Sequence, residues 1–206
     1  MRKLLFPICA AVLLLAGCSE TAPTAGEKKE AAKPPEPVTG ETALDRMFRV
    51  ARSWAPDAQV LQVNTITLSE VPNISPGTAA AWQATFVSPS AGQARGYTYS
   101  IIEAQGNLHQ GVFPGQQQSY NAHGTTTPFP IGAVKIDTTA AYKTALENGG
   151  SDYDKKTPGK PISFVLEKIE KFADPSWRVI WGESAGTSNF SVYVDATTGK
   201  FLEKMH

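Results

Sequence analysis

The three histidines of this 206-residue chain, His109, His123 and His206, are the first residues to consider for metal binding or acid–base chemistry. A zinc site needs several ligands at fixed spacings, as in an HExxH helix or in paired Cys and His motifs. None of the three histidines stands in such a motif, and His206 is the last residue. His109 and His123 lie in loop-like sequence, where an exposed or hydrogen-bonded histidine is expected. The sequence therefore predicts no metal site.

Asp152 and Asp154 have the spacing with which a calcium-binding loop begins. Such a loop also needs further oxygen ligands and a late glutamate. Lys155 and Lys156 follow instead. We therefore expect a solvated polar loop here, without a bound ion.

Nucleophilic catalysis is not indicated either. Ser90 and Ser184 each precede an Ala-Gly pair but do not form the G-x-S-x-G turn of serine hydrolases, so they are interpreted as turn residues. The carboxylates share no apolar setting, and Gly-rich phosphate loops are absent. We predict no catalytic residue, no cofactor-binding residue and no cofactor, and hence not an enzyme. A hydrolase stays a minor alternative, which clustering of His109, His123 and an acidic residue in a cleft would favour.

The N-terminus carries a different kind of chemistry. Arg2 and Lys3 precede an apolar run, residues 4–15, that is too short to span a bilayer. The run ends in Leu-Ala-Gly-Cys18, which resembles a bacterial lipobox. The resemblance implies a lipoprotein signal peptide over 1–17, cleavage before Cys18, and a membrane anchor of palmitate-type acyl chains on that cysteine. An ordinary secretory signal is the alternative. Ser19 favours the outer membrane of a bacterial cell envelope, with the protein facing the periplasm.

The composition limits the disulfides, the extent of the folded part and the classes of partner. Cys9 leaves with the signal peptide, so the mature chain would hold one blocked cysteine and no disulfide. Residues 18–40, the lipidated Cys and its linker, are rich in Ala, Pro, Glu, Lys and Thr and are predicted to be disordered, with an average span of roughly 25 Å. The 19 basic and 19 acidic residues cancel, which excludes the basic footprint of a nucleic-acid-binding protein.

Residues 41–113 predict a first α+β unit. A helix begins at Thr42, whose spacing to Asp45 is similar to a capping box, and ends near Trp54 because Pro56 follows. Alternating apolar residues predict three strands, over 60–68, 81–87 and 97–102. Residues 114–130, rich in Gln, Thr and Pro, are predicted to be an inter-unit loop.

Residues 131–206 predict a second α+β unit with the same order of elements. A helix capped by Asp137 or Thr138 ends at Gly149-Gly150, and a polar loop and a strand over 162–172 follow. Two alternating runs, 177–181 and 190–195, then form a hairpin. We predict an α+β fold of two related helix-plus-three-stranded antiparallel sheet units packed together, after a disordered tether.

An internal repeat is suggested by matched positions in the two units. Trp82 corresponds to Trp177, and a Ser-Ala-Gly triplet follows each tryptophan in the hairpin loop. The run 97–101 corresponds to 190–194. Because the identities are few, two unrelated helix-and-strand units are the alternative.

The C-terminal hairpin resembles the end of a PepSY domain. The resemblance rests on Pro175-Ser-Trp-Arg-Val179, on Val192-Tyr-Val-Asp-Ala196 and on Thr198-Gly-Lys200. It implies a small α+β module of the kind found in peptidase propeptides and envelope proteins, and a role in binding or restraining peptidases. It brings no metal-binding or catalytic residues.

These observations lead to two functional hypotheses. The first is a non-enzymatic envelope lipoprotein that binds an unknown envelope protein or peptide through an exposed sheet face or edge strand, with restraint of a peptidase as one form of this role. Tyr193, directed away from the presumed core, and Trp54, at a helix end, would be contact residues if they are exposed, whereas core and edge packing is the favoured interpretation of the aromatic residues. The alternative is a lipoprotein that binds a small apolar or lipid ligand between helix and sheet.

Overall fold

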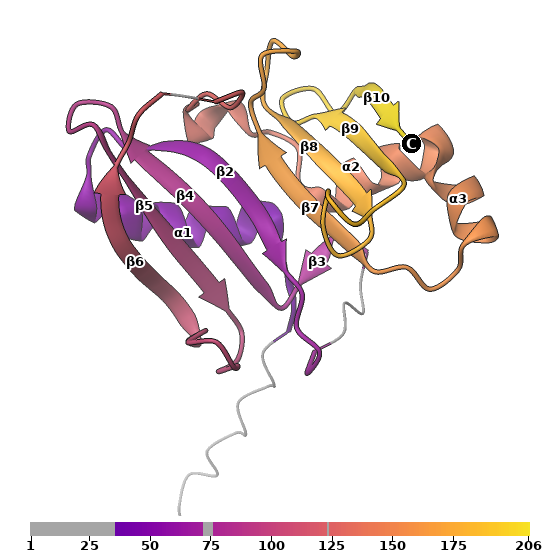
Figure 1. The fold of residues 1–206 in the computed structure, drawn as a ribbon, viewed down its shortest axis with the longest axis horizontal. Helices are drawn as coiled ribbons and strands as arrows, with labels where there is room; N and C mark the ends of the chain where they lie inside the picture. Colours follow the sequence, from indigo (N-terminus) through magenta and orange to yellow (C-terminus); the bar gives the residue numbers. More distant parts are fainter. Residues whose placement is uncertain (1–35, 72–75, 123) are drawn as a thin grey trace, which may run out of the picture. The chain divides into compact units, whose positions relative to one another are not determined.

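A computed structural model describes residues 36–71, 76–122 and 124–206 (Figure 1). The predicted signal peptide, Cys18 and most of the linker lie outside these ranges. The elements are β1 (Val38–Thr39), α1 (Gly40–Trp54), β2 (Gln59–Ile66), β3 (Thr78–Ala79), β4 (Ala81–Ser88), β5 (Gln93–Ser100), β6 (Gly111–Ser119), the 3-10 turn η1 (Ile131–Ala133), α2 (Thr138–Ala145), the π-helical turn η2 (Leu146–Gly150), α3 (Ser151–Lys156), β7 (Ile162–Glu167), β8 (Ser176–Trp181), β9 (Ser191–Asp195) and β10 (Phe201–Met205).

Eight strands form one antiparallel sheet in the order β10-β9-β8-β7-β2-β4-β5-β6. The helices cover one face of this sheet, with α1 behind β4 and β5 and α2 behind β8 and β9 (Figure 1). The centre of the sheet is the pairing of β2 with β7, in which Val63 lies opposite Leu166. From that centre each half continues outward strand by strand.

The prediction of two helix-plus-three-stranded units is wrong. Eight of the ten strands form a single sheet, in which β6 and β10 are additional to the strands that were expected, and β1 and β3 pair separately. Most of strand β6 was assigned to a loop because residues 114–130 are rich in Gln, Thr and Pro. Proline is tolerated there because β6 is an edge strand, where one N–H can be missing without breaking the ladder.

The described residues 124–130 do more than connect two units across the surface. The segment near Phe129 lies between the diverging ends of β2 and β7, and Val60 and Phe129 exchange two backbone hydrogen bonds of 2.9 Å. Thr127 N donates to Lys168 O at 2.9 Å. The buried Phe129 ring thus fills the gap that opens below the β2–β7 pairing.

Helix α1 follows from its apolar spacing and its ends. Thr39 is the N-cap and accepts a hydrogen bond from Thr42 N, so the helix begins two residues before the predicted start. Leu44, Met47 and Ala51 are buried against the sheet. The helix ends at Trp54 as predicted from Pro56.

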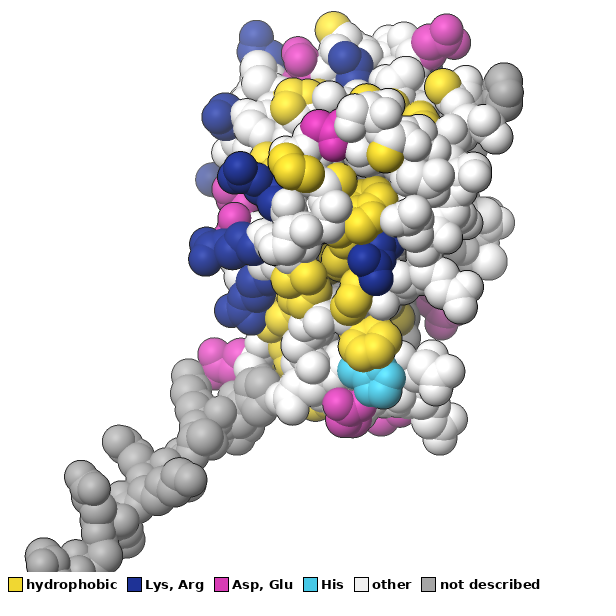
Figure 2. All heavy atoms as spheres, turned by 90° about the vertical axis from the view of Figure 1, so that its left-hand side faces the viewer, with side chains coloured by type: hydrophobic (Ala, Val, Ile, Leu, Met, Phe, Trp, Pro, Cys, Tyr) yellow, Lys and Arg dark blue, Asp and Glu magenta, His cyan; other side chains and the backbone are white. Residues whose placement is uncertain are grey.

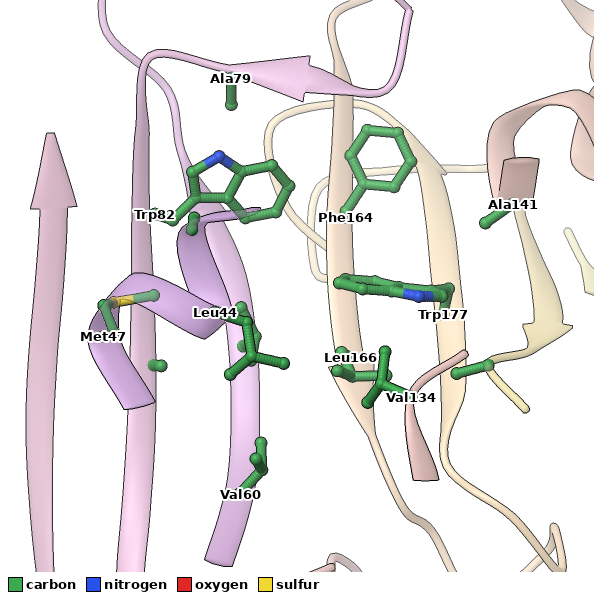
Figure 3. Packing of buried hydrophobic residues seen from close by; sticks show 14 of the residues in the cluster. Leu44, Met47, Val60, Ala79, Trp82, Val134, Ala141, Phe164, Leu166 and Trp177 are labelled. Atoms are coloured by element: carbon green, nitrogen blue, oxygen red, sulfur yellow. The ribbon is translucent and has the colours of Figure 1, made fainter. Parts of the chain in front are cut away.

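The two halves share one core. Phe164 packs against both Trp82 and Trp177, with ring centroids 6.2 Å and 6.5 Å away (Figure 3). Trp82 Nε1 donates to Val38 O at 3.1 Å, and Trp177 Nε1 donates to Ile136 O at 2.7 Å. Each tryptophan therefore binds the chain just before a helix begins, and both are fully buried.

The N-termini of α1 and α2 are joined directly. Asp137 Oδ1 accepts from Thr138 N at 2.7 Å and from Glu41 N at 3.0 Å, so one carboxylate serves both helices. Thr138 Oγ1 accepts from Gly40 N at 2.9 Å and donates to Gly77 O. This contact holds the N-terminus of α1 beside the N-terminus of α2.

Candidate binding surface along α1 and β6

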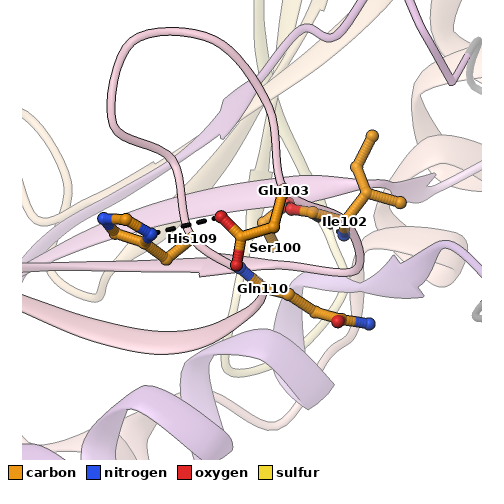
Figure 4. A network of polar contacts seen from close by, with 5 residues as sticks. All are labelled: Ser100, Ile102, Glu103, His109 and Gln110. Atoms are coloured by element: carbon orange, nitrogen blue, oxygen red, sulfur yellow. Dashed lines mark hydrogen bonds and ion pairs between the residues drawn. The ribbon is translucent and has the colours of Figure 1, made fainter.

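The histidines do not assemble into a site. His109 Nδ1 lies 3.1 Å from Glu103 Oε2, and Gln110 N donates to the other carboxylate oxygen at 3.0 Å (Figure 4). Glu103 therefore closes the β5–β6 connection. His206 instead lies against Phe190, and His123 is outside the described residues. Within the described ranges, no group of three or more His, Cys, Asp and Glu side chains could hold a metal ion.

Asp152 and Asp154 belong to helix α3 and not to a polar loop. Asp154 Oδ1 accepts a hydrogen bond of 2.6 Å from Trp181 Nε1, while Asp152 forms an exposed ion pair with Lys155. Gly150 allows α3 to come this close, because a Cβ there would lie 2.4 Å from the Trp181 ring. Asp154 is thus part of the packing of β8.

The two candidate serines lie in turns. Ser184 Oγ is 2.9 Å from Thr187 Oγ1. Ser90 N donates to Asp57 Oδ2 at 2.9 Å, and Ser88 Oγ donates to Asp57 Oδ1 at 2.7 Å. These bonds, that of Ser90 N first, lower the pKa of Asp57 from 3.8 to about 2. Asp57 acts as an acceptor that ties the α1–β2 turn to the β4–β5 turn.

The two aromatic residues proposed as contacts differ in exposure. Tyr193 does lie on the sheet face opposite the helices, but it is only 5 % exposed because Phe172 and Arg178 cover its ring. Trp54 is half-buried, and its Nε1 donates to Gln117 Oε1 at 2.7 Å. Trp54 therefore links the end of α1 to β6.

Strand β6 is a sheet edge next to α1. It pairs with β5 on one side, and no described strand pairs with its other side. Val112 and Pro114 stand opposite Tyr99 and Tyr97, which places them on the helix-covered face, whereas Phe113 stands opposite Thr98 on the other face. Phe113 is 48 % exposed, and Val50 on α1 is 38 % exposed. Figure 2 shows the result, an apolar stripe along this side of the molecule.

Basic side chains accompany the stripe (Figure 2). Arg46 on α1 donates to the Tyr99 hydroxyl and lies over that ring, with 5.0 Å from Cζ to the centroid. Arg95 on β5 donates to Gly115 O at 2.8 Å and lies over Tyr97. Burial raises the pKa of Tyr97, and the Arg95 guanidinium acts in the opposite direction. We call this set the α1–β6 surface: Arg46, Arg49, Val50, Trp54, Arg95, Val112, Phe113 and Pro114.

The charge on the α1–β6 surface is unbalanced. Arg49 is paired with Asp45 at 2.7 Å, but neither Arg46 nor Arg95 forms an ion pair with a carboxylate of the described residues. Residues 111–119 contain no Asp or Glu. The surface therefore combines exposed apolar groups with two guanidinium groups that lack a counter-ion in the described chain.

Sequence reasoning named Trp54 but missed the rest of this surface, because its parts are far apart in the chain. Val50 stands between basic residues on the outer side of α1, and this pattern could have indicated an exposed apolar patch. Its partner strand β6 was not predicted, because the Gln-, Thr- and Pro-rich composition of residues 114–130 led to the prediction of a loop.

A hollow lies on the sheet face opposite the helices. It measures about 620 Å³ and is lined by Thr125, Glu167, Ile169, Glu170, Lys171 and Tyr193. Its charged lining does not suit an apolar ligand. Between helices and sheet, the space is filled by large buried side chains such as Trp82, Phe164 and Trp177.

Comparison with known proteins gives a likeness of fold. No family model and no curated protein matches this chain. A crystal structure of a "putative lipoprotein" from Clostridium difficile 630 superposes with a TM-score of 0.51 at 9 % sequence identity, covering 79 % of this chain and 91 % of that one. At this identity the likeness concerns the fold alone.

Proposed function

We propose that the protein is a non-enzymatic lipoprotein of the bacterial envelope that binds a protein or peptide partner through the α1–β6 surface. The observation that carries the proposal is an edge strand bordered by exposed apolar side chains and by arginines without a carboxylate partner. Exposed apolar patches and free strand edges are typical of interaction sites. The resemblance to the PepSY hairpin makes an envelope peptidase the first partner to test.

Anchoring through Cys18 is the second part of the proposal. It is supported by the lipobox-like end of the signal and by the name of the structural neighbour. In the described ranges, no helix is long and apolar enough to cross a membrane. The periplasmic side of the outer membrane is the location that Ser19 favours.

The anchor can be tested with a single substitution. Cys18→Ala removes the thiol that would be acylated, so the chain should lose incorporation of radiolabelled palmitate and move from the membrane fraction to the soluble fraction. Cys9→Ala is the matched control, because Cys9 would leave with the signal peptide. Equal labelling of wild type and Cys18→Ala would refute lipidation at this residue.

The binding role needs an unbiased capture experiment. The mature chain from residue 18, with Cys18→Ala and a C-terminal tag, is used to capture proteins from an envelope extract, which are identified by mass spectrometry. Reproducible capture of a peptidase whose activity falls when the protein is added would support restraint. Absence of any specifically captured protein or peptide would contradict the proposed function.

The alternative of an apolar ligand between helix and sheet is not favoured by the packing. A ligand there would have to displace the fully buried rings of Trp82, Phe164 and Trp177. Removing such side chains from their packing costs several kcal/mol, on the order of 3–5 for a large aromatic residue. We therefore keep the partner-binding proposal alone.

A further inference from the structure

We propose that the segment bound at the α1–β6 surface is an extended, acidic stretch of polypeptide, held mainly by its side chains. This inference rests on the proposed function and names the chemistry of the partner. Its three supporting observations are the charge of the surface, the interruption of the β6 edge and the place of the apolar stripe.

The charge favours a negative partner. Arg46 and Arg95 are fixed in place by Tyr99 and by Gly115 O, respectively, so their orientation does not depend on a ligand. Neither forms an ion pair with a described carboxylate, although Arg46 lines a hollow together with Glu41 and Asp45. Preoriented guanidinium groups are well suited to carboxylates, which they can bind with two parallel hydrogen bonds.

The edge of β6 favours side-chain recognition over simple addition of a strand. Pro114 has no N–H, and the register between β5 and β6 shifts between the pairs of Arg95 and Tyr97. An added strand would therefore find a donor missing near the middle of β6. Because the edge is interrupted, backbone pairing with an added strand is weakened. A bound segment must therefore gain most of its affinity from contacts with the side chains of the surface.

The apolar stripe is the second source of that affinity. Val50 on α1 and Val112 on β6 lie on the helix-covered side of this edge, and the exposed Phe113 projects from the other face of the same edge strand. An extended chain directs successive side chains to opposite sides. A segment with alternating apolar and acidic residues would thus place one set on the stripe and the other near the arginines.

A defined probe tests this directly. The mature chain carrying Cys18→Ala is titrated into a fluorescein-labelled decapeptide of alternating Glu and Val, and the anisotropy is followed. A decapeptide of alternating Lys and Val is the charge control. We expect the acidic peptide to bind at least about tenfold more tightly, with the difference shrinking as salt screens exposed charges. Equal binding of the two peptides, or binding of neither, would overturn the inference.

Variants locate the binding. Arg46→Gln combined with Arg95→Gln should weaken binding of the acidic peptide about fivefold or more, in line with the loss of two exposed charge pairs. Lys155→Gln combined with Lys156→Gln removes the same charge from exposed positions on α3 and should change nothing. Because loss of the Arg95 contact could disturb β6, Val50→Asp is a second variant that keeps both arginines. It should also weaken binding, and unchanged affinity of both variants would place the site elsewhere.

The same variants separate failure of this inference from failure of the proposed function. If the envelope extract yields a specific partner that both α1–β6 variants capture as well as wild type, partner binding stands and this surface is wrong. If vesicles rich in phosphatidylglycerol bind in an Arg46- and Arg95-dependent way while the acidic peptide does not bind, the surface recognises a membrane and the inference is overturned.

Discussion

At the scale of single residues, Gly40 is the position where the shared core allows least change. A Cβ at Gly40 would lie 2.7 Å from the Trp177 ring and 2.7 Å from Thr138 Cγ2. Gly40→Ala should therefore cost about 1–3 kcal/mol of unfolding free energy, as overpacking usually does. Urea denaturation followed by tryptophan fluorescence measures this cost. Gly132→Ala is the control, because nothing lies within 4 Å of that Cβ; equal stability of the two variants would contradict the expectation.

Asp154 gives a second residue-scale prediction. Its carboxylate accepts from Trp181 Nε1, and Trp181 is only 1 % exposed. Asp154→Ala leaves a buried N–H without a partner, which costs about 1–3 kcal/mol. The near-UV circular dichroism of the tryptophans should change as well. Asp152→Ala, two residues away and exposed, should have little effect on either measurement.

At the scale of elements, Asp57 links two turns in a pH-dependent way. Its pKa is lowered to about 2, so its bonds to Ser88 and Ser90 stabilise the fold fully above about pH 4. That contribution is lost as pH falls through about 2. Asp57→Asn should therefore lose less stability than wild type between pH 5 and pH 2, measured by urea midpoints. Parallel pH profiles of the two proteins would refute this role, and a carboxyl-carbon NMR titration reads the pKa itself.

Elements were predictable from sequence where alternation was strong. Strands β4, β8 and β9 follow from period-two runs around Trp82, Trp177 and Val192. Strand β6 was missed because its proline is tolerated only through the position of the strand at the sheet edge. That position is set by the tertiary structure. Helix α3 was missed because Gly149 and Gly150 signal a helix end, whereas Gly149 takes φ +113° and the chain continues helically.

The candidate site was less predictable than the strands. It depends on α1 lying beside β6, and nothing in either segment specifies that neighbour. Tyr193 lies on the sheet face that was predicted for it. Its burial was not foreseen, because the ring of Phe172 that covers it belongs to a connection that was predicted to be part of a strand. The proposed internal duplication stays a prediction, although Trp82 and Trp177 make corresponding contacts before α1 and α2.

At the scale of the whole molecule, the two halves of the sheet should unfold together. They share the β2–β7 pairing, the Phe164 contacts and the segment around Phe129. Separating them would expose these apolar groups and leave two short sheets with free edges. The shared Asp137 carboxylate offers a way to test this coupling, because it serves the N-termini of α1 and α2 at once.

Asp137→Ala should destabilise the protein by about 1–3 kcal/mol, since one cap is lost and a second amide loses its acceptor. If the halves are coupled, amide hydrogen exchange should accelerate in both α1 and α2, and the unfolding transition should stay single. Asp45→Ala, on α1 but outside this contact, is the control and should leave α2 unchanged. Burial, Asp137 and Asp45 raise the pKa of Glu41 in that order, so the pKa of Glu41 should fall in Asp137→Ala. Faster exchange confined to α2, with α1 unaffected, would show that the two helices are anchored independently and that the halves are not coupled through their N-termini.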